Sequence, residues 1–263
     1  MDFIESDLGQ EYLKFCRLRN NSLKTGKMDL SIINWFYPTS LLPLGIFIKN
    51  NQVLSIVPPA DLSVLYYYNI ITKGEWSHSP ERSYIPIVQI PHNEHQREKI
   101  FEPLYNFESD SIGGLNAFSY FIGELVDNIC QHSSFSDAYI LAQKYETKKF
   151  TEVGIIDNGI SIPGAFENAG FEFNDTKALF EAINGQSTKS DVERGFGLRS
   201  SLKLLTKGLH GECLIVSRRG GLIATEEEKT LFNMDKDHEL SGTLICVRVP
   251  YIYKDVNIYD YIE

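Results

Sequence analysis

Cysteines are few in this sequence, and they are widely spaced. The chain has four, Cys16, Cys130, Cys213 and Cys246, and none forms a C-x-x-C pair or lies in a His-rich stretch. Zinc motifs and disulfide-rich proteins space their cysteines in recognisable patterns, which are missing here. The sequence therefore indicates neither a zinc site nor a disulfide framework, and we expect buried, reduced thiols.

Long hydrophobic runs are also missing. The most apolar stretch, residues 40–48 (SLLPLGIFI), is too short to span a bilayer and contains Pro43. The first 15 residues are acidic and lack the charged-then-apolar order of a signal peptide. We therefore expect a cytoplasmic protein that does not bind membranes.

Positive charge is scarce as well. The chain has 25 Lys and Arg residues against 35 Asp and Glu residues, which gives a formal net charge of -10. Binding to nucleic acid or to an anionic membrane needs a basic surface, so neither is expected as a partner. An anionic ligand would have to be met by a local basic patch.

The chain shows no internal repeat, low-complexity tract or Gly/Ser linker. Its 263 residues and 43% hydrophobic content suit one large domain or two modest ones. Residues 1–100 alternate between helical and strand patterns, so we expect a small α/β domain there, with a second domain over residues 101–263. Helices are expected at 6–18, 40–49, 60–71 and 93–105, and strands at 53–59 and 83–91.

A helix is expected over residues 113–133, because its apolar residues recur at helical spacing. At 100° per residue, Glu124, Asn128 and Gln131 share a different face, with Asp127 and His132 at its edges. A carboxylate beside a carboxamide is compatible with a ligand-binding face. An ordinary solvated face fits the same spacing.

Residues 154–166, GIIDNGISIPGAF, place Asp-Asn-Gly between two apolar runs. This pattern is a strong local signal for a β-hairpin with a tight turn. Residues 138–145 and 150–159 are expected to form adjacent strands, which would place Asp157 at a strand end where it could point into a cleft.

One stretch reverses the overall charge. Residues 187–219 carry seven Lys or Arg against three acids, and within them 194–198 (RGFGL) precede an amphipathic helical pattern. Backbone N–H groups at a helix start can bind phosphate, and glycine allows a close approach. The match to G-x-G-x-x-G fails because Ser200 stands at the last position, and no P-loop is present.

Four motifs occur together and in a fixed order. They are ELVDN (124–128), DNGISIP (157–163), STK…RGFGL (187–198) and SGTLICVRVP (241–250). In this order they resemble the ATP-binding domain of the GHKL superfamily, which includes gyrase B subunits, heat-shock chaperones, MutL proteins and sensor histidine kinases. The resemblance spans roughly residues 110–250. It implies an α+β fold, a two-layer α/β sandwich of the Bergerat type.

The resemblance also implies roles for single residues. Asn128 would ligate Mg²⁺ at the triphosphate, and Glu124 would activate the attacking nucleophile as the catalytic residue. Asp157 would accept from the adenine amine, and Gly159 would let the base approach. Ser161 stands where the motif usually has a second glycine.

Further contacts are implied around the phosphates and the base. The glycine-rich segment would contribute Gly195, Gly197 and Leu198, with Lys189 and Arg194 as charge partners. Thr243 would close the adenine pocket. Gln131 and His132 would touch phosphate or ribose, although capping or packing explains His132 equally well.

These features suggest an Mg·ATP-binding regulatory protein. It would act as an ATPase or as a serine/threonine protein kinase on a partner protein of a regulatory switch, with a lid over about 162–194 and a possible homodimer. No phospho-acceptor histidine box is present in its usual form, so a self-phosphorylating histidine kinase is not expected. A nucleotide-gated interaction module without catalysis is the alternative, and an α/β protein without nucleotide binding is the third possibility. Through residues 28–48 (MDLSIINWFYPTSLLPLGIFI) and its alternating pattern, the segment before residue 100 weakly resembles STAS-like partner domains of bacterial switch proteins.

Overall fold

The computed structural model describes residues 3–51, 55–73, 84–93, 112–186 and 197–261. Its helices are α1 (Asp7–Thr25), α2 (Pro38–Asn50), α3 (Leu62–Lys73), α5 (Leu115–His132), α6 (Ser161–Asn168), α7 (Asp175–Ile183) and α8 (Gly197–Lys203), the last continued by a π-helical turn, Leu204–Gly208. Its strands are β1 (Lys27–Asp29), β2 (Ser55–Val57), β3 (Tyr84–Gln89), β4 (Ala138–Tyr145), β5 (Phe150–Asp157), β6 (Glu212–Arg218), β7 (Gly220–Ala224), β8 (Lys229–Asn233) and β9 (Leu240–Pro250).

A seven-stranded antiparallel sheet forms the centre of the molecule. Its strand order is β3-β4-β5-β9-β6-β7-β8, while β1 and β2 form a separate parallel pair. Every pairing within the large sheet is antiparallel. The α+β class expected from the sequence is therefore confirmed.

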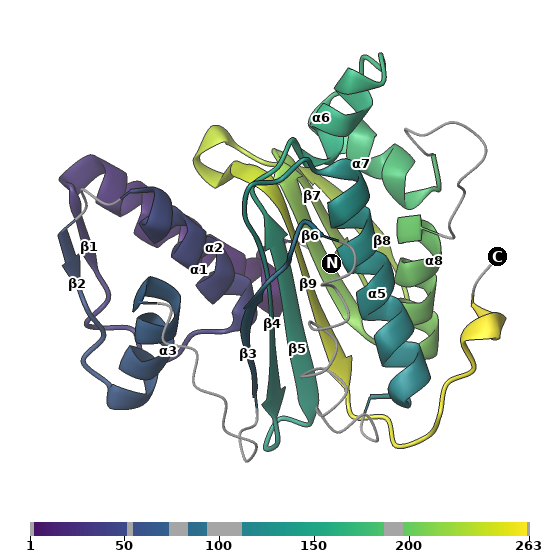
Figure 1. The fold of residues 1–263 in the computed structure, drawn as a ribbon, viewed down its shortest axis with the longest axis horizontal. Coiled ribbons are helices and arrows are strands. Elements are labelled where there is room, and N and C mark those ends of the chain that lie inside the picture. Colours follow the sequence, from purple (N-terminus) through teal and green to yellow (C-terminus); the bar gives the residue numbers. More distant parts are fainter. Residues whose placement is uncertain (1–2, 52–54, 74–83, 94–111, 187–196, 262–263) are drawn as a thin grey trace.

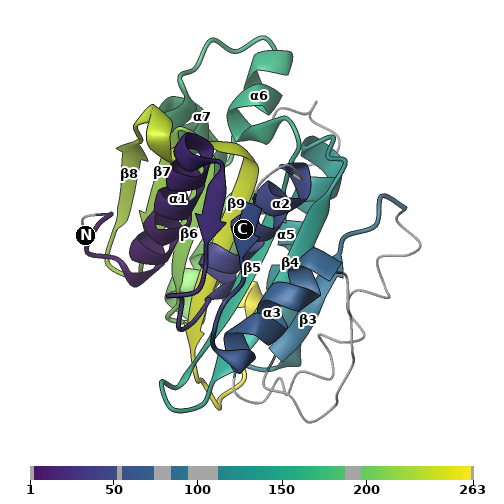
Figure 2. The ribbon, with the colours of Figure 1, turned by 90° about the vertical axis from the view of Figure 1, so that its left-hand side faces the viewer.

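Helices cover both faces of this sheet (Figure 1). α5, α7 and α8 lie on one face, and α1, α2 and α3 lie on the other, which faces the viewer in Figure 2. Residues 112–261 supply the helices on the first face and all strands of the sheet except β3. The helices of residues 7–73 add a third layer, because the second face of the sheet is apolar and must also be covered.

The strands are apolar on both sides for this reason. On β5, Val153 and Ile155 belong to the hydrophobic cluster under α5, whereas Ile156 belongs to the cluster under α1 and α2. Gly154, between Val153 and Ile155 in the sequence, lets α2 come close to the strand. A Cβ at this position would lie 2.7 Å from a methyl carbon of Leu42. Both clusters are therefore built on the same strands.

The border expected near residue 100 does not separate two cores in space. β3 belongs to the first segment but pairs with β4 of the second. Ile87 lies in the cluster under α1 and α2, and Ile90 lies in the cluster under α5. The helix expected over 93–105 falls almost wholly outside the described residues.

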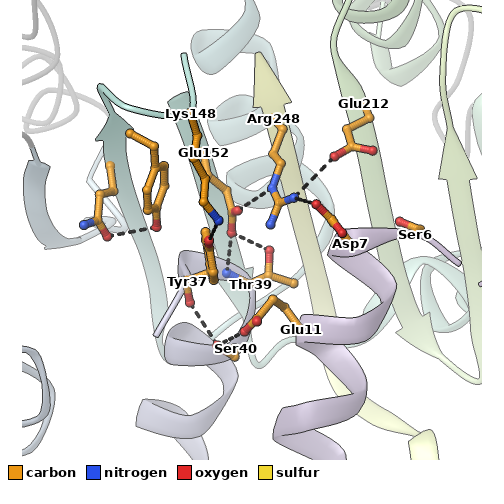
Figure 3. A network of polar contacts seen from close by, with 12 residues as sticks. Ser6, Asp7, Glu11, Tyr37, Thr39, Ser40, Lys148, Glu152, Glu212 and Arg248 are labelled. Carbon is orange, nitrogen blue, oxygen red and sulfur yellow. Dashed lines mark hydrogen bonds and ion pairs between the residues drawn. The ribbon is translucent and has the colours of Figure 1, made fainter. Parts of the chain in front are cut away.

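A buried network of polar contacts attaches the N-terminal helices to the sheet (Figure 3). Glu152 on β5 is fully buried; its Oε1 accepts from the backbone N–H (3.0 Å) and the hydroxyl (2.7 Å) of Thr39, and its Oε2 accepts from Nε of Arg248 (2.8 Å). Arg248 also donates from Nη1 to Asp7 (2.8 Å) and lies 3.8 Å from Glu212. α1, α2 and three strands thus meet at one charge cluster.

Across the part of the chain that the structure describes, no helix combines the length and the apolar character needed to cross a membrane.

Candidate functional site

Helix α5 presents the polar face expected from its sequence. Its apolar residues, including Phe118, Ile122 and Leu125, are buried against the sheet. On the other face, Glu124 is half-buried, and the side-chain Nδ2 of Asn128 is buried without a hydrogen-bond partner among the described residues. A buried amide donor left unpaired is costly, so Asn128 is placed as a ligand-binding side chain would be.

The start of α8 lies against Glu124. Burial raises the pKa of Glu124 above its usual value, and the nearby Asp127 raises it further. The backbone N–H of Gly197 lies within hydrogen-bonding reach of the carboxylate and lowers that pKa in part. The acidic face of α5 and the end of the glycine-rich stretch are thereby joined, although Glu124 and Gly197 are 73 residues apart in the sequence.

The hairpin indicated by Asp-Asn-Gly does not form, because β5 is followed by helix α6 and not by a second strand. Hydrogen bonds within this turn and to the neighbouring chain fix its conformation. Oδ1 of Asp157 accepts from the backbone N–H of Gly159 at 2.8 Å. Oδ1 of Asn158 accepts from the backbone N–H of Asp137 at 2.9 Å, and the N–H of Ile160 donates to the carbonyl of Ser133 at 2.7 Å. Since Ser133 directly follows α5, the turn is anchored at the C-terminal end of that helix.

Two glycines allow the chain to come this close. A Cβ on Gly159 would lie 2.0 Å from the carbonyl oxygen of Ser133. Gly242 has φ of +86°, and a Cβ there would lie 2.0 Å from the carbonyl oxygen of Asp157. No other amino acid fits at these positions without moving the backbone.

The carboxyl group of Asp157 is almost completely buried, with 1% of the residue exposed. Burial raises its pKa to about 6, although the N–H of Gly159 offsets part of that effect. A carboxyl group in such surroundings is an effective acceptor for a ligand N–H group, because little water competes for it.

Ser161 has the backbone conformation of a glycine. Its φ is +72°, in the left-handed region that side chains disfavour, and it begins α6 as a buried residue. Its Oγ accepts from the backbone N–H of Gly164 at 3.2 Å. The position expected to be glycine from the family motif is therefore occupied by a serine whose hydroxyl stabilises the first turn of the helix.

Thr243 lies directly opposite Asp157, as its register partner on β9. Its Oγ1 is 2.8 Å from Oγ of Ser217, the partner of Thr243 on β6. Ser217 could not be predicted from the sequence, because it lies in no local motif and its place beside Thr243 depends on the pairing of two strands.

Of the other expected site residues, three lie in the described part of the chain and three do not. Gln131 is exposed and His132 is half-buried at the end of α5, and Leu198 packs against the cluster under α5. Lys189, Arg194 and Gly195 lie outside the described residues.

The segment expected to be a lid, 162–194, is largely helical where it is described. It contains α6 and α7, and α7 buries Ala178, Leu179 and Ile183. Arg218 on β6 pairs with Glu167 of α6 through two hydrogen bonds of 2.6 and 2.9 Å. Residues 162–183 are thus tied to the body of the protein.

Within the described ranges, no three His, Cys, Asp or Glu side chains group in a way that would hold a metal ion.

No protein-family model matches this chain, and no curated protein sequence matches it either.

Proposed function

We propose that this chain is an Mg·ATP-binding regulatory protein, with a Bergerat-type fold of the GHKL kind over residues 112–261. One observation carries the proposal. The polar face of α5 meets the glycine-rich start of α8 at Glu124, and the same helix anchors the Asp157 turn at its end. The ELVDN motif, the DNGISIP motif and the described end of the RGFGL motif are therefore grouped around one helix.

The residues fit a bound Mg²⁺ ion and the triphosphate it accompanies. The amide oxygen of Asn128 is a hard ligand of the type that Mg²⁺ accepts, and its unpaired Nδ2 can donate to a phosphate oxygen. When bound, Mg²⁺ neutralises charge that develops on the phosphates. The N–H groups at the start of α8 add neutral donors on the same side.

The residues also fit an adenine base. Asp157 in its ionised form accepts from an exocyclic amine, whereas guanine would place a carbonyl oxygen opposite the carboxylate. The neighbouring hydroxyl of Thr243 supplies a group that can donate or accept.

We infer that Glu124 acts on the attacking group, and the direction of its pKa shift supports this role. Burial and Asp127 move its pKa toward neutrality, which favours a general base over a permanently ionised surface carboxylate. It would accept the proton of water in an ATPase, or of a serine or threonine hydroxyl of a partner protein in a kinase.

Nucleotide selectivity tests the proposal. Wild-type protein should bind Mg·ATP well above Mg·GTP in calorimetric titrations, and Asp157→Asn should lose about 1–3 kcal/mol of ATP affinity. Asp235→Asn, on the exposed surface, is the matched control. Equal affinity of the wild type for ATP and GTP would overturn the assignment of Asp157.

The acceptor of the phosphoryl group, water or a partner protein, can be identified with the same purified protein. Purified protein is mixed with labelled Mg·ATP in the presence and absence of lysate, and both free phosphate and labelled protein are followed. An ATPase releases phosphate alone, whereas a kinase labels a partner chain.

A nucleotide-gated module without catalysis is the second candidate, and the contact between Glu124 and Gly197 favours it. In that case Glu124 holds the start of α8, and a bound triphosphate would compete for the same N–H. Glu124→Gln decides between the two, with Glu172→Gln as the exposed control. A large loss of phosphoryl transfer with ATP binding retained supports catalysis, and unchanged transfer supports gating.

A further inference from the structure

Ser217 connects two parts of the site that are remote in sequence. It is fully buried on β6, and its Oγ lies 2.9 Å from the backbone N of Ile162, 2.8 Å from Oγ1 of Thr243 and 3.3 Å from the carbonyl oxygen of Gly242. One hydroxyl therefore touches the first turn of α6 and the strand that carries Thr243.

The hydrogen-bonding capacity of this hydroxyl is limited. Ser217 has one proton to donate and two lone pairs. The N–H of Ile162 takes one lone pair, because a backbone amide can only donate. The carbonyl of Gly242 can only accept, so the single proton of Ser217 goes either to that carbonyl or to Thr243.

In one of these two arrangements the hydroxyl of Thr243 can donate to a ligand, and in the other it can only accept. If Ser217 donates to Thr243, the proton of Thr243 is free to be donated to a ligand. If Ser217 donates to Gly242, Thr243 donates to Ser217, and its oxygen can then only accept from a ligand. The shorter distance, 2.8 Å against 3.3 Å, favours contact between the two hydroxyls, and either direction of donation satisfies it.

The other contact of Ser217 controls the start of α6. Ile162 is in the first turn of this helix, where backbone N–H groups have no partner within the helix. It follows Ser161, whose left-handed backbone turns the chain into the helix. Without Ser217, this buried end of α6 loses a partner for one of its amides.

We propose that Ser217 is a positioning residue that orients the hydroxyl of Thr243 toward the bound base and, through the same oxygen, anchors the first turn of α6. The inference rests on the proposed function, since the base is that of the bound nucleotide. Base contact and the position of α6 are then linked through one side chain.

The anchoring part is tested without nucleotide. In Ser217→Ala, the amide of Ile162 should exchange with solvent at least about tenfold faster in NMR hydrogen-exchange measurements, because its hydrogen-bond acceptor is gone. Ser22→Ala, which removes a buried serine hydroxyl on α1, should leave the exchange of Ile162 unchanged. Unchanged exchange at Ile162 in Ser217→Ala would overturn this part. Should the alanine variant fail to fold, Ser217→Cys keeps the size and replaces the hydroxyl with a weaker partner.

The orienting part is tested with nucleotide analogues. Ser217→Ala should weaken ATP binding about three- to tenfold. The analogues 1-deaza-ATP and 7-deaza-ATP each lack one ring acceptor of adenine. With the analogue that lacks the nitrogen facing Thr243, wild type and Ser217→Ala should bind equally, because the interaction is already absent. With the other analogue, the difference seen for ATP should persist.

The possible results separate the two proposals. An equal loss for ATP and both analogues would show that Ser217 has only a structural role, and no loss for ATP would show that it has no role in binding. Either result overturns the proposal that Ser217 orients Thr243, but neither overturns the proposal that the protein binds ATP. If the wild type binds none of these nucleotides, the proposed function is overturned, and the orienting part fails with it.

Discussion

At the residue scale, burial has its clearest effect on Asp157. In the folded protein its pKa is raised to about 6 from its usual value of 3.8, chiefly by burial. Between these two values the folded state binds more protons than the unfolded state, so its stability falls as the pH rises through this range. At neutral pH the folded protein holds an ionised carboxylate in a site that disfavours charge.

Replacing this carboxyl group should therefore stabilise the protein while harming the site. Asp157→Asn removes the charge, and Oδ1 of the asparagine can still accept from Gly159. We expect the free energy of unfolding in urea to rise by up to about 3 kcal/mol at pH 7.5. At pH 3.5, below both pKa values, the gain should disappear. A destabilised Asp157→Asn protein at pH 7.5 would contradict the assigned burial of charge.

The raised pKa of Asp157 also predicts how ATP affinity depends on pH. An amine donor prefers the ionised carboxylate, so affinity should be constant above pH 7 and should fall as the pH drops through about 6. Calorimetric titrations from pH 5 to pH 8 measure this, and Asp157→Asn should flatten the profile in that range. A wild-type profile without a step near pH 6 would contradict the role of Asp157.

Asn128 should affect metal-dependent binding more than stability. Its Nδ2 is already buried without a partner among the described residues, so Asn128→Ala removes an unsatisfied group and should change the urea midpoint little. The gain in ATP affinity on adding Mg²⁺ should fall about tenfold or more. Asn116→Ala, exposed on the same helix, is the control. A variant that keeps the full Mg²⁺ effect would remove Asn128 from the metal site.

At the scale of elements, the start of α6 combines backbone strain with a local hydrogen bond. Ser161→Ala keeps φ near +72° and loses the acceptor for Gly164, so it should cost about 1–2 kcal/mol. Ser161→Gly loses the same acceptor but relieves the strain. We therefore expect the glycine variant to be more stable than the alanine variant in thermal unfolding, and the reverse order would contradict this account.

Elements with strong local signals could be predicted from the sequence. The expected helix over 113–133 and strands over 138–145 and 150–159 are confirmed as α5, β4 and β5, with bounds shifted by at most two residues. The first helix was predicted to end at residue 18, but α1 continues to Thr25, where Gly26 stops it in a left-handed conformation. Residues 19–25 are mostly polar, so periodicity gave no evidence for them.

At the scale of the whole molecule, the layers could not be predicted. The strands are apolar on both faces, which indicates that both faces are covered but does not identify the helices that cover them. That information depends on contacts such as Thr39 with Glu152, 113 residues apart in the sequence. In the same way, the partnership of Ser217 with Thr243 depends on strand order.

The charge cluster under α1 and α2 should be essential for stability. Arg248→Met leaves Glu152 buried without its cation, and we expect a loss of about 3–5 kcal/mol of unfolding free energy. Burial already raises the pKa of Glu152, and removing Arg248 raises it further, so the loss should shrink as the pH falls. The double variant Arg248→Met with Glu152→Gln should recover part of the loss in urea unfolding, and full additivity of the two changes would contradict the pairing.

The close approach at Gly159 and Gly242 has a consequence for saturation libraries of the whole chain. No side chain fits at either position, so every substitution there should lower the amount of folded protein in cells. Asp157 should behave in the opposite way, with neutral polar replacements retained at high abundance but failing a functional selection. A scan that measures abundance and activity separately would thus distinguish Gly159 and Gly242, which are needed for the turn to fold, from Asp157, which is needed for activity.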